Sequence, residues 1–169
     1  LDHNRCILCR RCARACSELV GMNTLGFEER GSATMLTADL GEQWGKSTCI
    51  SCGTCEQVCP TGSMVNRFSA YQGHKSQAEA VPTVCVGCGV GCQPVVYVRD
   101  NRVIRIDGDF DAELNTGVVC RQGRFESLLE KGDRVSQPMV RKDGKLVACS
   151  WDEALTAAAA VLKDQPAAW

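Results

Sequence analysis

The stretch CISCGTCEQVCP, residues 49–60, places four cysteines within eleven positions and follows the last one with a proline. The same spacing occurs earlier, in CILCRRCARAC at residues 6–16, where each cysteine lies 43 positions before its counterpart. Within C-x-x-C the two sulfurs lie on one tight turn, which suits two ligands of a single metal centre. The repeat therefore predicts two similar metal-binding runs in one small body.

The spacing also distinguishes between three kinds of cysteine-rich protein. Thirteen cysteines in 169 residues can build a disulfide scaffold with one free thiol. Disulfide scaffolds spread their cysteines to close loops, whereas this chain clusters them, and zinc sites typically use paired C-x-x-C knuckles. Three cysteines at this spacing followed by C-P are typical of the bacterial ferredoxin run, which binds [4Fe–4S] clusters. We therefore favour iron–sulfur clusters over zinc or disulfides.

The repeat predicts a crossed set of ligands. In two-cluster ferredoxins the fourth cysteine of each run binds the cluster of the other run. The first cluster is then assigned to Cys6, Cys9, Cys12 and Cys59. The second is assigned to Cys16, Cys49, Cys52 and Cys55. Because neither set is complete without both runs, we expect metal binding to drive folding here, and two neighbouring clusters suit serial one-electron transfer.

Other side chains in the two runs bear on the electrostatics of the clusters. Small residues in the second run leave room for a cluster, and their backbone N–H groups can donate to its sulfur and raise its potential. These residues are Ser51, Gly53 and Thr54. Arginines in the first run form either a solvated helix face or a set of charges that offset an anionic cluster. These residues are Arg10, Arg11 and Arg14.

Residues 17–48 form a long insertion between the runs. TLGFEER and SATMLTADL predict two short strands around Gly31-Ser32, and Ser17, unlike Pro60, allows a helix to continue past its run. The insertion is either a surface hairpin or a docking face for a partner subunit.

A third cysteine pattern, CVGCGVGC, follows a polar stretch at residues 69–82 that predicts a linker. His74 in this linker and His3 are left without a ligand role. The third set of candidate ligands is Cys85, Cys88, Cys92 and Cys120. We expect a third [4Fe–4S] cluster here, with a four-cysteine zinc site as the alternative.

A hairpin explains how the last cysteine of this set reaches the others. Val95–Arg99 and Arg102–Asp107 are rich in β-forming residues and flank Asp100-Asn101, a favourable turn. A hairpin of this length returns the chain to its start, so Cys120 can meet Cys92.

The C-terminal residues predict the first elements of another domain. A second hairpin is expected around Lys142–Lys145, and SWDE at residues 150–153 is a capping box that opens a helix. One face of that helix is apolar and needs a packing partner. This face comprises Trp151, Ala154, Leu155, Ala158 and Leu162. Cys149 belongs to none of the three sets, and we expect a buried structural thiol.

Composition excludes other classes of function. The net charge is −1, which gives no reason to expect nucleic acid as a partner. No apolar run approaches the length of a membrane span, so we expect no direct membrane insertion.

The segments CVGCGVGC, GDFDAELNTGVVCRQGRF and PMVRKDGKLVACSWDEAL resemble the opening of a molybdopterin oxidoreductase large subunit. The resemblance is greatest to the α subunit of NAD-linked cytoplasmic formate dehydrogenase, and the two-cluster portion is similar to the large iron–sulfur subunit of respiratory complex I. It implies a cytoplasmic protein whose third cluster lies beside a molybdenum or tungsten bis(pyranopterin guanine dinucleotide) bound by residues beyond Trp169. It also implies partner subunits that bind flavin, NAD(P) or further iron–sulfur clusters.

The expected fold class is α+β, with a two-cluster ferredoxin-like domain, a small β-rich [4Fe–4S] domain and the first elements of a larger domain that is absent. The expected boundaries are 1–68 for the ferredoxin-like domain with its 17–48 insertion, 69–82 for the linker, 83–127 for the molybdopterin-oxidoreductase-type [4Fe–4S] domain and 128–169 for a truncated pterin-type domain.

Gln122 departs from the pattern of the resembling family. Formate dehydrogenases carry a Lys two residues after the fourth cysteine, within CVKGR, between cluster and pterin, whereas this chain reads CRQGR. Gln122 has no charge. Either the pterin partner differs, or Arg121 or Arg124 substitutes for the lysine, or no pterin is bound.

These observations predict an electron-transfer segment with three [4Fe–4S] clusters in the large subunit of a multi-subunit, formate dehydrogenase-like oxidoreductase. It would pass electrons between a pterin site and a flavin/NAD(P) or ferredoxin partner. We expect no catalytic residue within the segment itself. The alternative is a non-catalytic electron-wiring subunit of a flavin-based or electron-bifurcating NAD(P)-linked complex that has no pterin.

Overall fold

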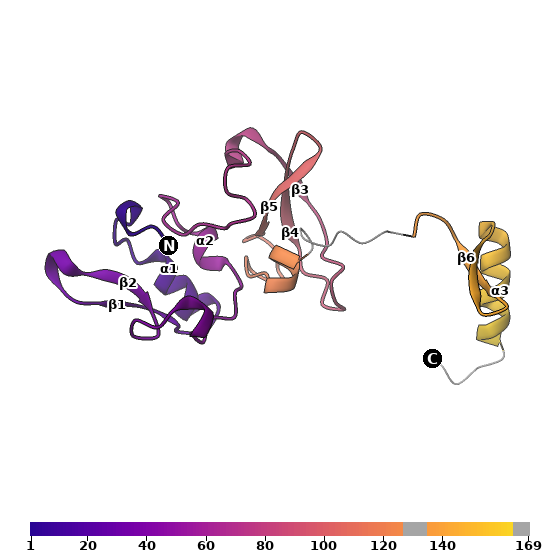
Figure 1. Cartoon of the computed structure of the whole chain (residues 1–169), viewed down its shortest axis with the longest axis horizontal. Coiled ribbons are helices and arrows are strands. Elements are labelled where there is room, and N and C mark those ends of the chain that lie inside the picture. Colours follow the sequence, from indigo (N-terminus) through magenta and orange to yellow (C-terminus); the bar gives the residue numbers. More distant parts are fainter. Residues whose placement is uncertain (127–134, 164–169) are drawn as a thin grey trace. The chain divides into compact units, whose positions relative to one another are not determined.

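The structure, a computed structural model, describes residues 1–126 and 135–163. The chain forms two units, Leu1–Glu130 and Lys131–Trp169. Helices and strands are both present, as the α+β prediction requires (Figure 1).

The two cysteine runs fold alike. In each run a residue with left-handed backbone lies between the second and third cysteines, Arg10 with φ 62° and Gly53 with φ 73°. A short helix follows at once, α1 (Arg11–Arg14) in the first run and α2 (Thr54–Gln57) in the second. Past α1 the chain continues as a π-helical turn, η2 (Ala15–Leu19), as expected from Ser17.

The insertion forms the predicted hairpin. Strands β1 (Leu25–Glu28) and β2 (Met35–Ala38) pair antiparallel and are joined by a 3-10 turn, η3 (Gly31–Ala33). Apolar side chains of the hairpin pack on the first run, because alternate residues of a strand point to one face. The resulting core comprises Cys12, Leu25, Leu36, Ala38 and Met64.

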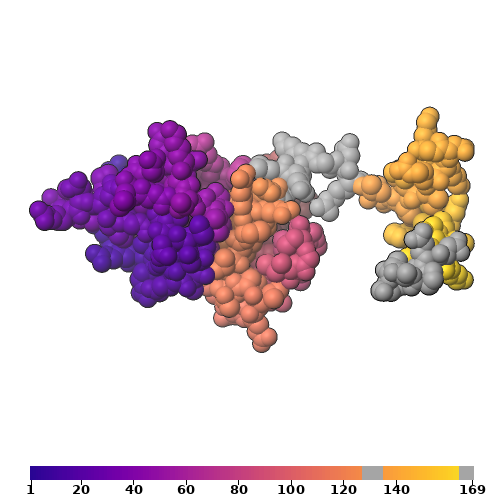
Figure 2. Space-filling view, turned by 90° about the horizontal axis from the view of Figure 1, so that it is seen from below, coloured from indigo at the N-terminus to yellow at the C-terminus, as the bar shows by residue number. Residues whose placement is uncertain are grey.

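A three-stranded antiparallel sheet follows in the order β3-β4-β5. Its central hairpin joins β4 (Pro94–Arg99) and β5 (Arg102–Gly108) as predicted, and Asp100 and Asn101 both have positive φ, which suits a two-residue turn. A π-helical turn, η6 (Gln122–Glu126), follows Cys120. We call residues 79–126 the third module. Figure 2 shows it packed directly against the ferredoxin-like part.

The stretch expected to be a linker, residues 69–82, is partly structured. Its last four residues form strand β3 (Glu79–Pro82), which pairs with β4, and Lys75 binds Asp107 of β5. The polar composition suggested a loop, but all four residues of β3 are exposed, as a polar edge strand allows. The remaining short 3-10 helices are η1 (His3–Arg5), η4 (Trp44–Lys46) and η5 (Lys75–Gln77).

The second unit is a hairpin and a helix. Strands β6 (Met139–Lys142) and β7 (Lys145–Ala148) precede α3 (Trp151–Lys163), as predicted. The Ser150 hydroxyl caps α3 by accepting from Glu153 N–H over 3.2 Å, and the Glu153 carboxylate pairs with Lys142 over 2.6 Å. Cys149, expected to be buried, is only partly so. None of the helices in the described ranges has the length and apolar character to cross a bilayer.

Candidate metal centres

The first cavity gathers thiols from both runs. Cys6, Cys9 and Cys12 line it together with Cys59, the last cysteine of the second run. Burial acts to raise the pKa of the Cys59 thiol, but hydrogen bonds from the backbone of Met64 and Thr61 outweigh it, so that the pKa falls below its usual value. Such donors favour the thiolate, which is the form that binds metal.

The second cavity has the reciprocal composition. It is lined by Cys49, Cys52 and Cys55 with Cys16 from the end of the first run. Burial, followed by the neighbouring Cys52 and Cys49 thiols, raises the pKa of Cys55 to about 12. A free thiol there would stay protonated, whereas a coordinated metal removes the proton outright. The structure thus brings together the same two sets of cysteines that the ferredoxin rule assigns, while the ligation itself stays a prediction.

Thr54 indicates that the second cavity suits a sulfur-rich group. The residue is fully buried, lines the cavity, and its hydroxyl has no hydrogen-bond partner among the described residues. An unpaired buried hydroxyl costs about 1–3 kcal/mol, so a cluster sulfur able to accept from it would remove that cost. No group of three or more His, Cys, Asp or Glu in the described ranges is placed to hold a lone metal ion. A [4Fe–4S] cubane has eight atoms, so the cysteines that bind it surround a larger space than the ligands of a single ion do.

The third set also comes together, in the third module. The pKa of Cys92 is raised by burial and then by the thiols of Cys85, Cys120 and Cys88. The Cys85 N–H donates to the Cys92 carbonyl over 2.8 Å. All thirteen cysteines lie in the described part of the chain, and none of them forms a disulfide.

Gly123 allows the end of this set to approach its beginning. A Cβ at this position would lie 3.2 Å from Cys85 Sγ and 2.9 Å from Val119 Cγ1. The Gly123 N–H also faces Cys120 Sγ over 3.5 Å. The donor set and the close backbone approach fit a [4Fe–4S] cluster, which would supply one-electron chemistry when bound.

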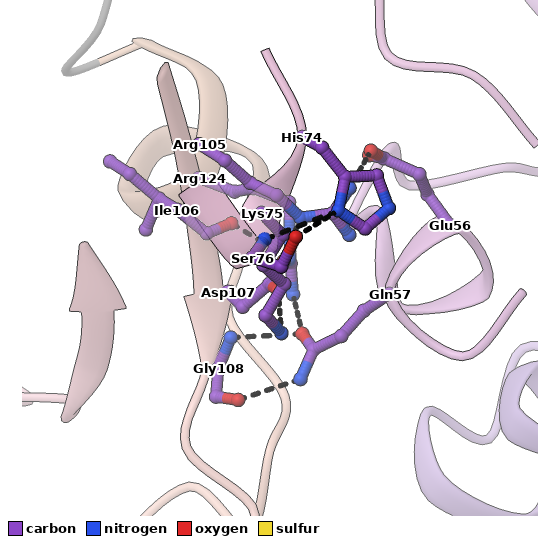
Figure 3. A network of polar contacts seen from close by, with 10 residues as sticks. All are labelled: Glu56, Gln57, His74, Lys75, Ser76, Arg105, Ile106, Asp107, Gly108 and Arg124. Atoms are coloured by element: carbon purple, nitrogen blue, oxygen red, sulfur yellow. Dashed lines mark hydrogen bonds and ion pairs between the residues drawn. The ribbon is translucent and has the colours of Figure 1, made fainter. Parts of the chain in front are cut away.

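A polar network, buried at Asp107 and Arg124, connects the second run to the third module (Figure 3). Asp107 lies at its centre and accepts from Lys75 over 2.9 Å, from Arg105 over 2.8 Å and from Arg124 over 3.2 Å. Arg105 also binds Glu56 of α2 over 2.7 Å. Burial raises the pKa of the Glu56 carboxyl, although the positive charges of Arg105 and Arg124 act to lower it.

Gln57 and Arg124 complete this network. The Gln57 amide both donates to and accepts from the backbone of Gly108, over 2.6 and 2.9 Å. Arg124 donates to Gln57 Oε1 over 2.8 Å, to the Ile106 carbonyl over 2.9 Å and to the Cys52 carbonyl over 2.7 Å. We call this set the Arg124 network: Glu56, Gln57, Lys75, Arg105, Asp107 and Arg124. Sequence reasoning missed it, and the only local signal is the glycine at position 53, against which Arg124 packs.

Comparison with known families fits this architecture. Residues 5–63 match the 4Fe-4S dicluster domain, residues 78–127 the molybdopterin oxidoreductase Fe4S4 domain, and residues 134–168 the molybdopterin oxidoreductase family. The chain thus has two regions similar to iron–sulfur domains, and the second of them is of the molybdopterin oxidoreductase type. The resemblance inferred from the sequence is thereby confirmed.

Relatives within this family carry several names. The chain is 38% identical over 91% of its length to one of the NADH-quinone oxidoreductase subunits of Rhizobium meliloti, covering 18% of that protein. It is 35% identical over 96% of its length to the alpha subunit of the NADPH-Fe(3+) oxidoreductase of Geobacter sulfurreducens, covering 18%. A formate dehydrogenase-like protein of Staphylococcus haemolyticus is 26% identical over 91% of the chain, which covers 20% of it. The chain thus spans about a fifth of the length of these relatives.

The structure shows what Gln122 and the two arginines beside it contact. Gln122 is exposed and its side-chain amide donates to the Gly87 carbonyl over 3.1 Å, which ties it to the loop of Cys85 and Cys88. Arg124, one of the two arginines named as replacements for the family's lysine, has a side chain that is 1% exposed and donates to the Cys52 carbonyl of the second run. Arg121 is exposed and paired with Glu126 over 3.1 Å.

Proposed function

We propose that this iron–sulfur segment carries three [4Fe–4S] clusters and passes electrons one at a time along them. The observation that supports the proposal best is the pair of cavities, each lined by three cysteines of one run and the last cysteine of the other. Two adjacent centres of this kind, with a third set of thiols in the packed neighbouring module, make a relay rather than a substrate site. The expected ligands of the third cluster are Cys85, Cys88, Cys92 and Cys120.

At its ends, the proposed relay connects a molybdenum or tungsten pterin site to a flavin/NAD(P)-binding or ferredoxin partner, as in a formate dehydrogenase-like complex. Two of the relatives are named as single subunits of larger oxidoreductases, which supports the idea of redox partner subunits. The match of residues 134–168 to the molybdopterin oxidoreductase family supports a pterin-type domain at this end of the chain, for which we propose the bounds 128–169. The cytoplasmic location belongs to the same proposal.

A non-catalytic wiring subunit without a pterin is the second candidate. Identity to the relatives named for NADH and NADPH, 38% and 35%, exceeds the 26% to the formate dehydrogenase-like protein. Gln122, which carries no charge, also favours this candidate. Metal analysis of the whole protein separates the two candidates. Molybdenum or tungsten near one per chain supports the enzyme, and full iron without either metal supports the non-catalytic subunit.

The number and ligation of the clusters can be tested directly. Anaerobically prepared protein should contain ~12 iron per chain, four for each cubane. On reduction, the two ferredoxin-type clusters should give overlapping, spin-coupled EPR signals. Cys120→Ser should remove one cluster and spare that coupled pair. Loss of the coupled pair instead would show that Cys120 is wrongly assigned, and stoichiometric zinc in a colourless protein would refute the iron–sulfur proposal.

A further inference from the structure

Arg124 belongs to the loop of the third cysteine set but ends beside the second set. Its backbone N–H donates to the Cys120 carbonyl over 3.0 Å, and its Nε donates to the Cys52 carbonyl over 2.7 Å. One residue therefore links the backbones of two cysteines that we assign to different clusters. The side chain is 1% exposed, so the link is shielded from water.

The second run leaves space for this arginine at one position. A Cβ at Gly53 would lie 2.4 Å from Arg124 Cδ and 2.7 Å from Phe125 Cζ, well inside contact distance. Gly53 also has φ 73°, a conformation that strains other residues. Gly53 thus allows the guanidinium to lie against the backbone of a predicted cluster ligand.

The charges of the Arg124 network do not cancel. Two carboxylates, Glu56 and Asp107, face three cations, so the fully ionised network has a formal charge of +1. The cations are Lys75, Arg105 and Arg124. Arg124 is the most buried of the three, with 1% of its side chain exposed against 21% for Arg105 and 49% for Lys75. The excess charge of the network therefore lies partly in solvent at Lys75, whereas the charge of Arg124 lies inside the protein, where it is screened far less.

We propose that Arg124 raises the reduction potential of the second cluster and so draws electrons from the third cluster into the ferredoxin-like pair. This inference rests on the proposed function. In the step, the reduced third cluster loses one electron and the oxidised second cluster gains it, with no proton and no further reactant. The gained electron adds negative charge to a cluster already anionic through its four thiolates. The buried guanidinium stabilises that charge through the Cys52 backbone, so Arg124 is a positioning residue and not a ligand.

The test compares two arginines of the same turn in the full chain, assembled anaerobically with iron and sulfide. In Arg124→Gln we expect full iron content. We also expect the potential of the second cluster, one of the spin-coupled pair, to fall by about 59 mV, which is a tenfold change in the equilibrium constant for one electron. Arg121→Gln is the matched control, because Arg121 lies one residue after Cys120 but is 66% exposed and paired with Glu126. EPR-monitored redox titration measures all potentials. Full iron with an unmoved potential in Arg124→Gln overturns the inference.

A second variant separates charge from structure. Asp107→Asn removes the anion that faces Arg124 and should raise the same potential, opposite to Arg124→Gln. If both variants lower the potential, Arg124 acts only by holding the modules in place and the inference is overturned. If Arg124→Gln fails to retain iron, the direction of the Asp107→Asn shift decides. Failure of the proposed function looks different, because the unmodified chain would then lack the ~12 iron expected for three cubanes.

Discussion

The two cysteine runs have the same backbone but different neighbours. Leu8 and Ser51, which occupy equivalent positions, have φ 52° and 56°, and Arg10 and Gly53 have φ 62° and 73°. Spacing and conformation are therefore repeated together. A metal site needs both, because the backbone sets where each thiol points, so the shared features are those that metal binding requires.

The side chains between the cysteines differ, and they decide what each run contacts. In the first run Arg14 binds Glu18 on its own helical turn over 2.9 Å and is exposed, while Arg10 lies over the Phe27 ring at 5.5 Å. At the position of Arg14 the second run has Gln57, which binds the backbone of Gly108 and the Arg124 side chain. At this position the side chain of the first run binds within its own run, whereas the side chain of the second run binds the third module.

Removing a ligand that one run supplies to the cluster of the other should have the largest effect. Cys59→Ala removes the fourth ligand of the first cluster while leaving the three cysteines of the first run intact. We expect iron to fall from ~12 to ~8 per chain and the spin-coupled EPR signal to become that of an isolated second cluster. Cys149→Ala, outside all three sets, is the control and should keep its iron. Equal iron in the two variants would remove the basis for the crossed assignment.

Making the second run resemble the first should be the next most damaging change. Gly53→Arg places a Cβ 2.4 Å from Arg124 Cδ, which is too close, and should displace the buried guanidinium from Asp107. Leaving a buried charge without its partner costs about 3–5 kcal/mol. We expect cluster absorbance to be lost at a much lower denaturant concentration, and proteolysis between residues 66 and 78 to accelerate. Wild-type resistance in both assays would mean that the third module is not held by Arg124.

The sequence predicted the repeated part of this comparison and missed the part that differs. The spacing within each run identified a two-cluster ferredoxin, whose rule assigns Cys59 to the first run and Cys16 to the second. Asp100-Asn101 located a hairpin, because a tight turn is local in sequence. No local sequence signal of this kind identifies Arg124 or Asp107. They are 17 residues apart, and a buried ion pair has the same residue types as a solvated one. Only tertiary packing makes Arg124 buried, so no periodicity could have identified it.

A smaller effect should follow from Thr54, whose counterpart in the first run is Arg11. If the buried Thr54 hydroxyl donates to cluster sulfur, Thr54→Val loses one hydrogen bond, worth about 1 kcal/mol, and lowers the potential of the second cluster. Redox titration of the loaded protein measures this shift. Thr37→Val, at a half-buried threonine on β2, is the matched control. An unchanged potential together with a more stable protein would show that the hydroxyl stays unpaired when the cluster is bound.

The smallest effect is expected from the reverse exchange, Arg10→Gly. Relief of a left-handed backbone at a non-glycine residue favours the variant by about 1–2 kcal/mol. Against this, the contact of Arg10 with the Phe27 ring is worth about 0.5–1 kcal/mol, and the added freedom of glycine in the unfolded chain costs about 0.4–1 kcal/mol. The contributions nearly cancel, so the denaturant midpoint for cluster loss should stay close to that of wild type. A large loss of stability would mean that the Arg10 side chain holds the first run as Arg124 holds the second, and the contrast between the two runs would fail.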